Sequence, residues 1–160
     1  MTIAHYQTIF GFHWHTTHRL LVCAENLPEA AYFTNPGFGH GSLHELFFHL
    51  LRVDDNWHTA LKTGRQQNPL LIEHYPDLQS IQAGFEKTRT DWTEALGRLS
   101  DALVESDALL YNWRGEAVTI PRWRLLQHVI LHGMQHHAEI AHLLTLQDQS
   151  PGDIDFIFYE

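Results

Sequence analysis

The sequence predicts an all-α protein, an up-down four-helix bundle. Three observations favour this fold: four long segments carry apolar residues at helical spacing, turn-forming residues separate them, and one segment opens with a capping box. The chain has 160 residues, 44% of them hydrophobic, which is typical of one folded domain. We therefore expect a single domain over residues 1–160.

The first two expected helices span residues 2–26 and 42–63. On the first, the residues that share one face at 100° per residue are Tyr6, Phe10, His13, Thr17, Leu20 and Ala24. Pro28 ends or kinks this helix, and a loop rich in glycine follows. The second helix begins at Ser42, which with Glu45 has the form of a capping box, and Gly64 is its expected C-terminal cap.

The third and fourth expected helices span residues 77–104 and 121–147. A polar loop over residues 66–76 precedes the third helix. Between the two helices, residues 109–120 place apolar and aromatic side chains on both sides of an Arg-Gly-Glu turn, which predicts a small hairpin or an extended connection. Pro121 fits the first position of the fourth helix. We expect the aromatic residues of the tail, 156–159, to pack back onto the bundle.

Composition excludes several functional classes. The formal net charge is -9 and the 10 Lys and Arg residues are scattered, which argues against nucleic acid as the main partner. No apolar run approaches the roughly 20 residues that a membrane span requires, and the first residues lack the pattern of a secretory signal. The single cysteine, Cys23, cannot form an internal disulfide and is interpreted as a packing residue. A cytoplasmic location is the simplest expectation.

The fourteen histidines are far more than an average chain of this length carries, and imidazole is a common ligand of transition metals. On the fourth expected helix His128, His132 and His136 are spaced four apart, so each ring lies 40° around the axis from the one before. Either of the two overlapping pairs, His128 with His132 or His132 with His136, could bind one ion. The other interpretation is a helix face of exposed or hydrogen-bonded histidines. His137 points 100° away from His136 and is not expected to share an ion.

On the second expected helix, His49 falls within the apolar stripe, whereas His44 and His58 are predicted to face outward. A buried polar group without a partner costs about 1–3 kcal/mol, so His49 needs one. A metal shared with two imidazoles of another helix meets this need. A neutral core histidine bonded to a carbonyl or a side chain meets it equally well.

Two further residues have both a functional and a structural interpretation. Glu139 lies seven residues after His132 and could orient a ligand or bind a metal-bound water, or be a surface glutamate. His13, on the apolar stripe of the first helix, could face the same cavity, although a hydrogen-bonded core histidine is the favoured interpretation.

The run from Arg122 to Ile140 resembles the fourth helix of the DinB/YfiT-like family, whose members are regarded as metalloenzymes. The tail from Ser150 to Phe156 resembles the same family, and Leu46 to Leu50 with Trp57 resembles its helix with the first metal ligand. The resemblance spans nearly the whole chain, although the first and third helices match only in general pattern.

The resemblance implies a four-helix bundle with a three-histidine metal site. Carried onto this chain, its ligands are His49, His132 and His136, which excludes His128. The chain departs from the family after the last ligand, where an arginine, a small residue and a glutamine are usual and His137, Ala138 and Glu139 stand here. It also departs on the first helix, where His15 and Thr17 replace a tryptophan and an asparagine. These departures leave the metal site intact and put a shared substrate in doubt.

Family members with an assigned activity resemble metal-dependent thiol transferases or isomerases that use mycothiol, bacillithiol or glutathione. The leading hypothesis is thus an enzyme in which one divalent metal, such as Zn, Ni or Fe, activates a small thiol cosubstrate or a water. Three protein ligands leave a position open, as in catalytic sites. The alternatives are a metal-stabilised binding or stress-response module, with a homodimer as a family-level expectation, and an interaction domain without metal.

Overall fold

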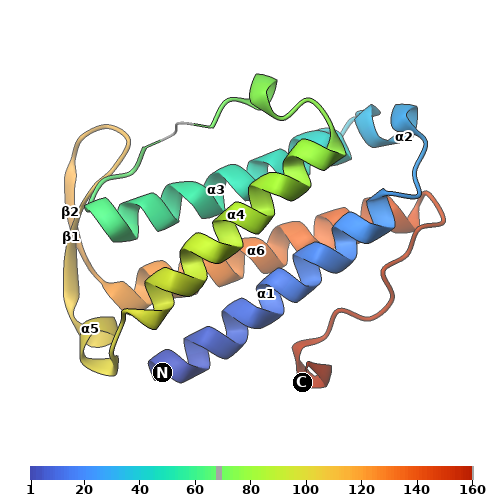
Figure 1. The fold of residues 1–160 in the computed structure, drawn as a ribbon. Coiled ribbons are helices and arrows are strands. Elements are labelled where there is room, and N and C mark those ends of the chain that lie inside the picture. Colours follow the sequence, from blue (N-terminus) through green and yellow to red (C-terminus); the bar gives the residue numbers. More distant parts are fainter. Residues whose placement is uncertain (68–69, 160) are drawn as a thin grey trace.

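Four long helices form a bundle in the computed structural model, which describes residues 1–67 and 70–159. They are α1 (Ile3–Ala24), α3 (Leu43–Thr63), α4 (Leu78–Gly97) and α6 (Arg122–Thr145) (Figure 1). Short elements join them: α2 (Glu29–Phe33), α5 (Asp101–Glu105) and the 3-10 turns η1 (Ile72–His74) and η2 (Phe156–Phe158). The predicted all-α four-helix bundle is confirmed. Two residues of the expected 66–76 loop, and the last residue of the tail, lie outside the described residues.

The long helices form a ring in which α1 packs chiefly on α6 and α4, and α3 packs chiefly on α4 and α6. Neighbouring contacts show the directions. On α4, Gly84 lies against Leu51, and the Trp92 indole donates to the Asp54 carbonyl at 3.1 Å, so α3 and α4 run the same way. The helix order is therefore up-down-down-up, a difference from simple alternation. The described parts of the connection, residues 64–67 and 70–77, lie along the bundle toward the end at which α3 begins (Figure 1).

Side chains at the helix ends explain where the helices begin and stop. The Ser42 hydroxyl accepts from the Glu45 amide at 3.2 Å, and the Glu45 carboxylate accepts from the Ser42 amide at 2.7 Å. This confirms the predicted capping box. Gly64 ends α3 with a φ of 73°, a left-handed conformation that glycine adopts without strain. Helix α6 follows Pro121, which is its N-cap residue and the last residue of a strand.

The third expected helix is shorter than predicted. It ends at Gly97, and a separate short helix, α5, covers Asp101–Glu105. Glycine is a poor helix former, and the Ser100 hydroxyl accepts from the Leu103 amide at 3.3 Å, which starts a new helix. The apolar stripe continues across the break, and for this reason periodicity alone does not reveal it.

The hairpin interpretation of residues 109–120 is confirmed. Strands β1 (Asp107–Tyr111) and β2 (Ala117–Pro121) pair antiparallel. The Tyr111 amide donates to the Gly64 carbonyl at 2.8 Å, which fastens the hairpin to the end of α3. The hairpin thereby fixes the point from which α6 starts back along α3.

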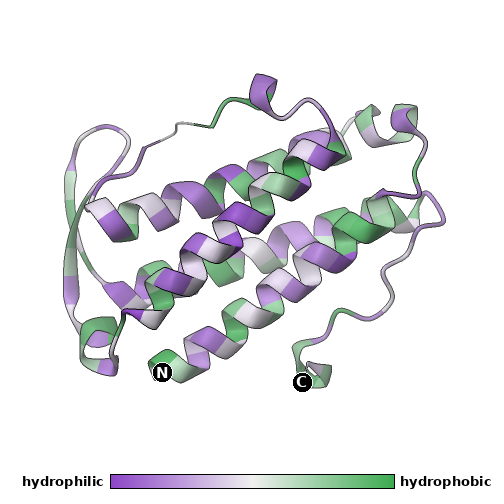
Figure 2. Cartoon of the chain, viewed as in Figure 1, coloured by the Kyte–Doolittle hydropathy of each residue, from purple (hydrophilic) through white to green (hydrophobic). Residues whose placement is uncertain are grey.

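The bundle core is mainly apolar, although polar side chains such as His13 and Asp54 are also buried, and hydrophobic and hydrophilic residues alternate along the helices (Figure 2). The aromatic tail packs back only in part: Phe156 and Tyr159 contact Phe12, with ring centroids 5.2 and 5.6 Å away, whereas Ile157 and Phe158 are exposed. Cys23 is half-buried against the core, in agreement with a packing role. Within the described part of the chain, no helix is long and apolar enough to cross a bilayer.

Candidate metal centre

The three histidines singled out from the sequence lie together between α3 and α6. The Nε2 atom of His132 is 3.2 Å from Nε2 of His49 and 3.0 Å from Nε2 of His136. Zinc–imidazole bonds of about 2.0–2.1 Å at tetrahedral angles place two donor nitrogens about 3.3 Å apart. These two separations, both involving His132, are close to the spacing that ligands of one ion adopt.

The helices explain this meeting. His132 and His136 are one turn apart on α6, with ring centroids at 4.3 Å. Helix α3 packs beside α6 and is antiparallel to it. His49 extends from α3 toward the rings of His132 and His136. His136 is buried, whereas His49 and His132 are half-buried, so the site opens toward solvent rather than into the core.

Burial keeps the rings of His49 and His132 neutral. Together with like-charge repulsion from the neighbouring histidines, it lowers the pKa of His49 to about 4 and that of His132 to about 3. A metal binds the lone pair of an imidazole, so the neutral form is the one that binding requires.

Glu139 fixes the orientation of one ring. Its Oε2 atom accepts from Nδ1 of His136 at 2.9 Å. Burial alone would raise the pKa of Glu139, but the hydrogen bond from His136 helps to outweigh it and to hold the pKa below its usual value. A carboxylate that accepts a hydrogen bond from Nδ1–H keeps the lone pair of the neutral ring on Nε2, a common arrangement behind metal-bound histidine.

Neutral rings supply few protons for the contacts in this cluster. With the proton of His136 on Nδ1, its Nε2 can only accept, so a hydrogen bond between the two rings requires His132 to donate from Nε2. This one proton then has two nitrogens within reach, Nε2 of His136 and Nε2 of His49, and only one of them can receive a full hydrogen bond. A cation bound by the three lone pairs would replace these contacts. The donor set therefore fits a divalent transition metal, for which imidazole is a suitable ligand.

A fourth histidine, His40, lies against the cluster. Its ring stacks on His49 with centroids 4.9 Å apart and meets His136 edge-on at 4.7 Å. One ring nitrogen of each of these three residues lies within 4.8 Å of the others. Sequence reasoning missed His40 because it lies in the glycine-rich loop before α3, where no helical period applies. Its nearness to the start of the helix with His49 is the signal that could have found it.

His13 belongs to a buried network beside the cluster, which confirms the core interpretation. Its Nε2 lies 2.9 Å from Oδ2 of Asp54, and both side chains are almost completely buried. His137 points away from the cluster, as expected, and its Nε2 lies 2.8 Å from the Thr17 hydroxyl. His128 is exposed and packs edge-on against Trp57, at 5.0 Å.

The prediction that His44 and His58 face outward was wrong. Their exposed fractions are only 6% and 9%. Helix α3 is covered on several sides, by α4, α6 and α2, so its buried arc is wider than one apolar stripe. His44 packs against Tyr32 of α2 and His58 against Trp92 of α4, and burial lowers the pKa of both histidines.

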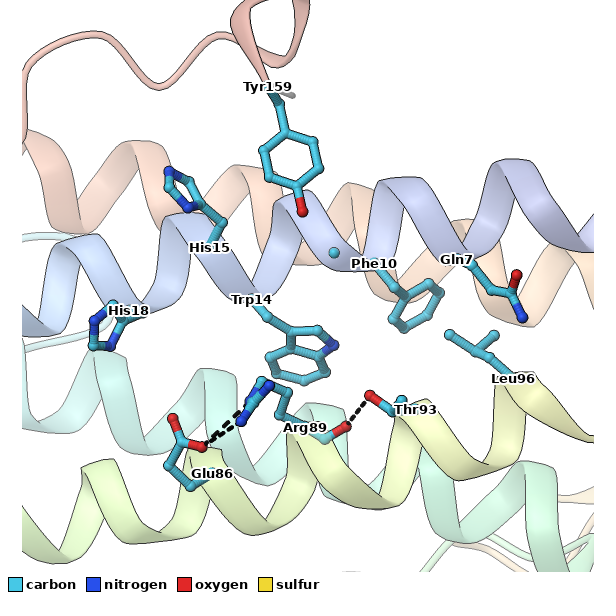
Figure 3. A pocket seen from close by; sticks show the side chains of 11 residues that line it. Gln7, Phe10, Trp14, His15, His18, Glu86, Arg89, Thr93, Leu96 and Tyr159 are labelled. Atoms are coloured by element: carbon cyan, nitrogen blue, oxygen red, sulfur yellow. Dashed lines mark hydrogen bonds and ion pairs between the residues drawn. The ribbon is translucent and has the colours of Figure 1, made fainter.

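The largest cleft among those described lies elsewhere, between α1 and α4. Its volume is about 600 Å³, and Trp14, Arg89 and Tyr159 are among its lining residues (Figure 3). The Arg89 guanidinium is paired with Glu86 at 2.8 Å. None of the clustered histidines lines this cleft. The cleft and the candidate metal ligands therefore lie in different parts of the bundle.

Comparisons with known proteins bear on the family and the fold. The family model described as the DinB family matches residues 3–160. A solved structure of YfiT from Bacillus subtilis, described as a probable metal-dependent hydrolase with an unusual four-helix bundle topology, has a TM-score of 0.69. It is 16% identical, and the match covers 89% of this chain and 87% of that chain. At this identity the likeness shows the fold alone. A search of curated proteins found no match.

Proposed function

This chain belongs to the DinB family, and from that premise we propose that it is a metal-dependent hydrolase whose ion is held by His49, His132 and His136. The observation that carries the proposal is the close approach of three imidazole nitrogens, with Nε2 of His132 lying 3.0 Å from that of His136 and 3.2 Å from that of His49. YfiT, with the same fold, is itself described as a probable metal-dependent hydrolase.

The ion would be Zn, Ni or Fe, since all three accept imidazole ligands. When bound, such an ion acts as a Lewis acid and lowers the pKa of a water or a thiol beside it. Three protein ligands leave room for that group, whereas sites closed by four protein ligands are usually structural.

The residues around the ligands perform the remaining tasks. Glu139 holds the proton of His136 on Nδ1, so the Nε2 lone pair faces the site. Its carboxylate is 34% exposed, which allows it to exchange protons with solvent or with a substrate. The half-buried surroundings of His49 and His132 keep both rings unprotonated near neutral pH.

Metal analysis of protein purified without a histidine tag tests the first part of the proposal. We expect close to one equivalent of metal in the natural chain and its loss in His132→Ala. The control is His128→Ala, which removes an exposed histidine one turn before His132, with its ring centroid 5.9 Å from that of His132. Metal content below about a tenth of an equivalent, unchanged by His132→Ala, would contradict the metal site.

Activity assays test the second part. A panel of esters, amides and phosphoesters should show turnover that disappears on chelation and returns with metal. An electrophile offered with glutathione or a related thiol tests thiol transfer in parallel. Full metal occupancy without turnover on either panel would instead favour a metal-stabilised binding module.

A further inference from the structure

We propose that His40 is a fourth, exchangeable ligand of this metal, carried on the loop between α2 and α3. The inference rests on the proposed metal site and adds a statement about how its open position is controlled. When His40 is bound, it fills the coordination position that the other three histidines leave open. An incoming ligand would have to displace His40 from that position.

The first argument is placement. The ring of His40 touches two of the three proposed ligands, stacked on His49 at an interplanar angle of 25° and edge-on to His136 at 86°. One nitrogen of its ring lies within 4.8 Å of a nitrogen of each. Small movements of a side chain would bring that nitrogen to bonding distance from a shared ion.

The second argument is the shared carboxylate. Oε2 of Glu139 lies 3.3 Å from Nδ1 of His40 and 2.9 Å from Nδ1 of His136. A carboxylate accepts, so both rings are oriented with Nδ1 as donor. This leaves the Nε2 lone pair of His40 free, as it does for His136. One acidic side chain thus prepares two imidazoles for the same task.

The third argument is the difference in burial and support. His136 is 1% exposed and fixed within a helix, whereas His40 is 43% exposed and lies between Gly39 and Gly41. Both glycines have positive φ, 65° and 97°, a conformation that other residues rarely adopt. The loop brings His40 onto the site without burying it. Among the four histidines, this ring can therefore leave and return at the lowest cost.

Cobalt-loaded full-length protein tests the proposal, because the absorption of Co(II) reports its coordination. We would compare the natural chain with His40→Ala and with His40→Phe, which keeps an aromatic ring against His49 but has no nitrogen. His128→Ala is the matched control. Both His40 variants should alter the cobalt spectrum and weaken metal binding at least about tenfold, the lower range for changes around a metal ligand, while His128→Ala should do neither.

Azide provides the second readout, since it needs a free position on the ion. In the natural protein azide competes with His40, so both His40 variants should bind azide more tightly than the natural chain. Equal metal affinity, an unchanged cobalt spectrum and equal azide affinity in all proteins would overturn the proposal.

The outcomes separate this inference from the proposed function. If His132→Ala loses the metal and His40→Ala keeps it with an unchanged spectrum, the three-histidine site stands and the fourth ligand is wrong. If His40→Ala loses the metal and His132→Ala keeps it, His40 is a ligand and the set of three must be revised to His40, His49 and His136. Absence of metal from the natural chain would overturn both.

Discussion

At the scale of single residues, the His13–Asp54 pair is the most costly polar contact to disturb. It joins α1 to α3 at 2.9 Å, and its side chains are 1% and 0% exposed. Oδ1 of Asp54 and Nδ1 of His13 have no hydrogen-bond partner among the described residues, so the one contact compensates for burying both groups.

We therefore expect Asp54→Asn to destabilise the protein by about 1–3 kcal/mol, the cost of leaving a buried donor or acceptor without its partner. Urea unfolding of metal-free protein measures this. The control is Asp91→Asn, which removes an exposed pair with Lys87 and should cost less than about 1 kcal/mol. Equal losses in the two variants would contradict the special role of the buried pair.

His58 is expected to make stability depend on pH. Burial lowers its pKa in the folded protein, and although Asp91 and Asp55 oppose this, Lys62 and Lys87 add to it. In the unfolded chain His58 has a pKa of about 6.5, so below that pH it binds a proton in the unfolded chain but not in the folded one. His58 therefore contributes to the free energy of unfolding above that pH, and this contribution is lost as the pH falls.

Urea unfolding at pH 7.5 and pH 5.5, with a chelator present, checks this expectation. The natural chain should lose more unfolding free energy on acidification than His58→Gln, which has no titrating ring at this position. Identical losses would show that His58 titrates normally in the folded state.

At the scale of helices, the approach of α1 to α6 depends on Gly133. A Cβ atom at this position would collide with the ring of His13, which Asp54 holds in place. We expect Gly133→Ala to cost about 1–3 kcal/mol, as overpacking in a core does.

Gly97 is the matched control, because a Cβ there would meet no atom within 4 Å and its φ is not in the left-handed region. Gly97→Ala should be neutral or stabilise by up to about 1 kcal/mol, since alanine is the better helix former. Thermal or urea unfolding of both variants tests the pair. A neutral Gly133→Ala would mean that His13 can move aside.

The helices themselves were predictable because each buries one face, and burial leaves a period of 3.6 in the sequence. The capping box at Ser42 and the left-handed Gly64 were predictable because their chemistry is local. The break after Gly97 and the direction of α4 were not, because both depend on how the chain packs after the helix has formed.

Some residues of the candidate site could likewise be predicted from the sequence, and others could not. His49, His132 and His136 could be selected by facing, spacing and family resemblance, and the structure places Nε2 of His132 3.2 Å from that of His49 and 3.0 Å from that of His136. The burial of His44 and His58 depends on α2 and α4, which no pattern within α3 records. His40 depends on the path of a loop, and for such a path the sequence has no period to follow.

At the scale of the whole molecule, a bound metal should stabilise the fold. A ligand that binds only the folded state adds about 2.7 kcal/mol to its stability at a free concentration one hundred times its Kd. Adding zinc to metal-free protein should therefore raise the unfolding midpoint. His132→Ala should abolish this rise and His128→Ala should preserve it, as scanning calorimetry would show.

The meeting of His49 with His132 also has a consequence for how the chain unfolds. These residues are 83 positions apart, and the segment between them contains all of α4 and the hairpin. An ion shared by α3 and α6 would act as a reversible crosslink across that segment. It would hold the two ends of this long loop together. The metal-free chain, in contrast, loses the entropy of loop closure each time it folds. Metal supply would then set the lifetime of the folded state as well as any chemistry at the site.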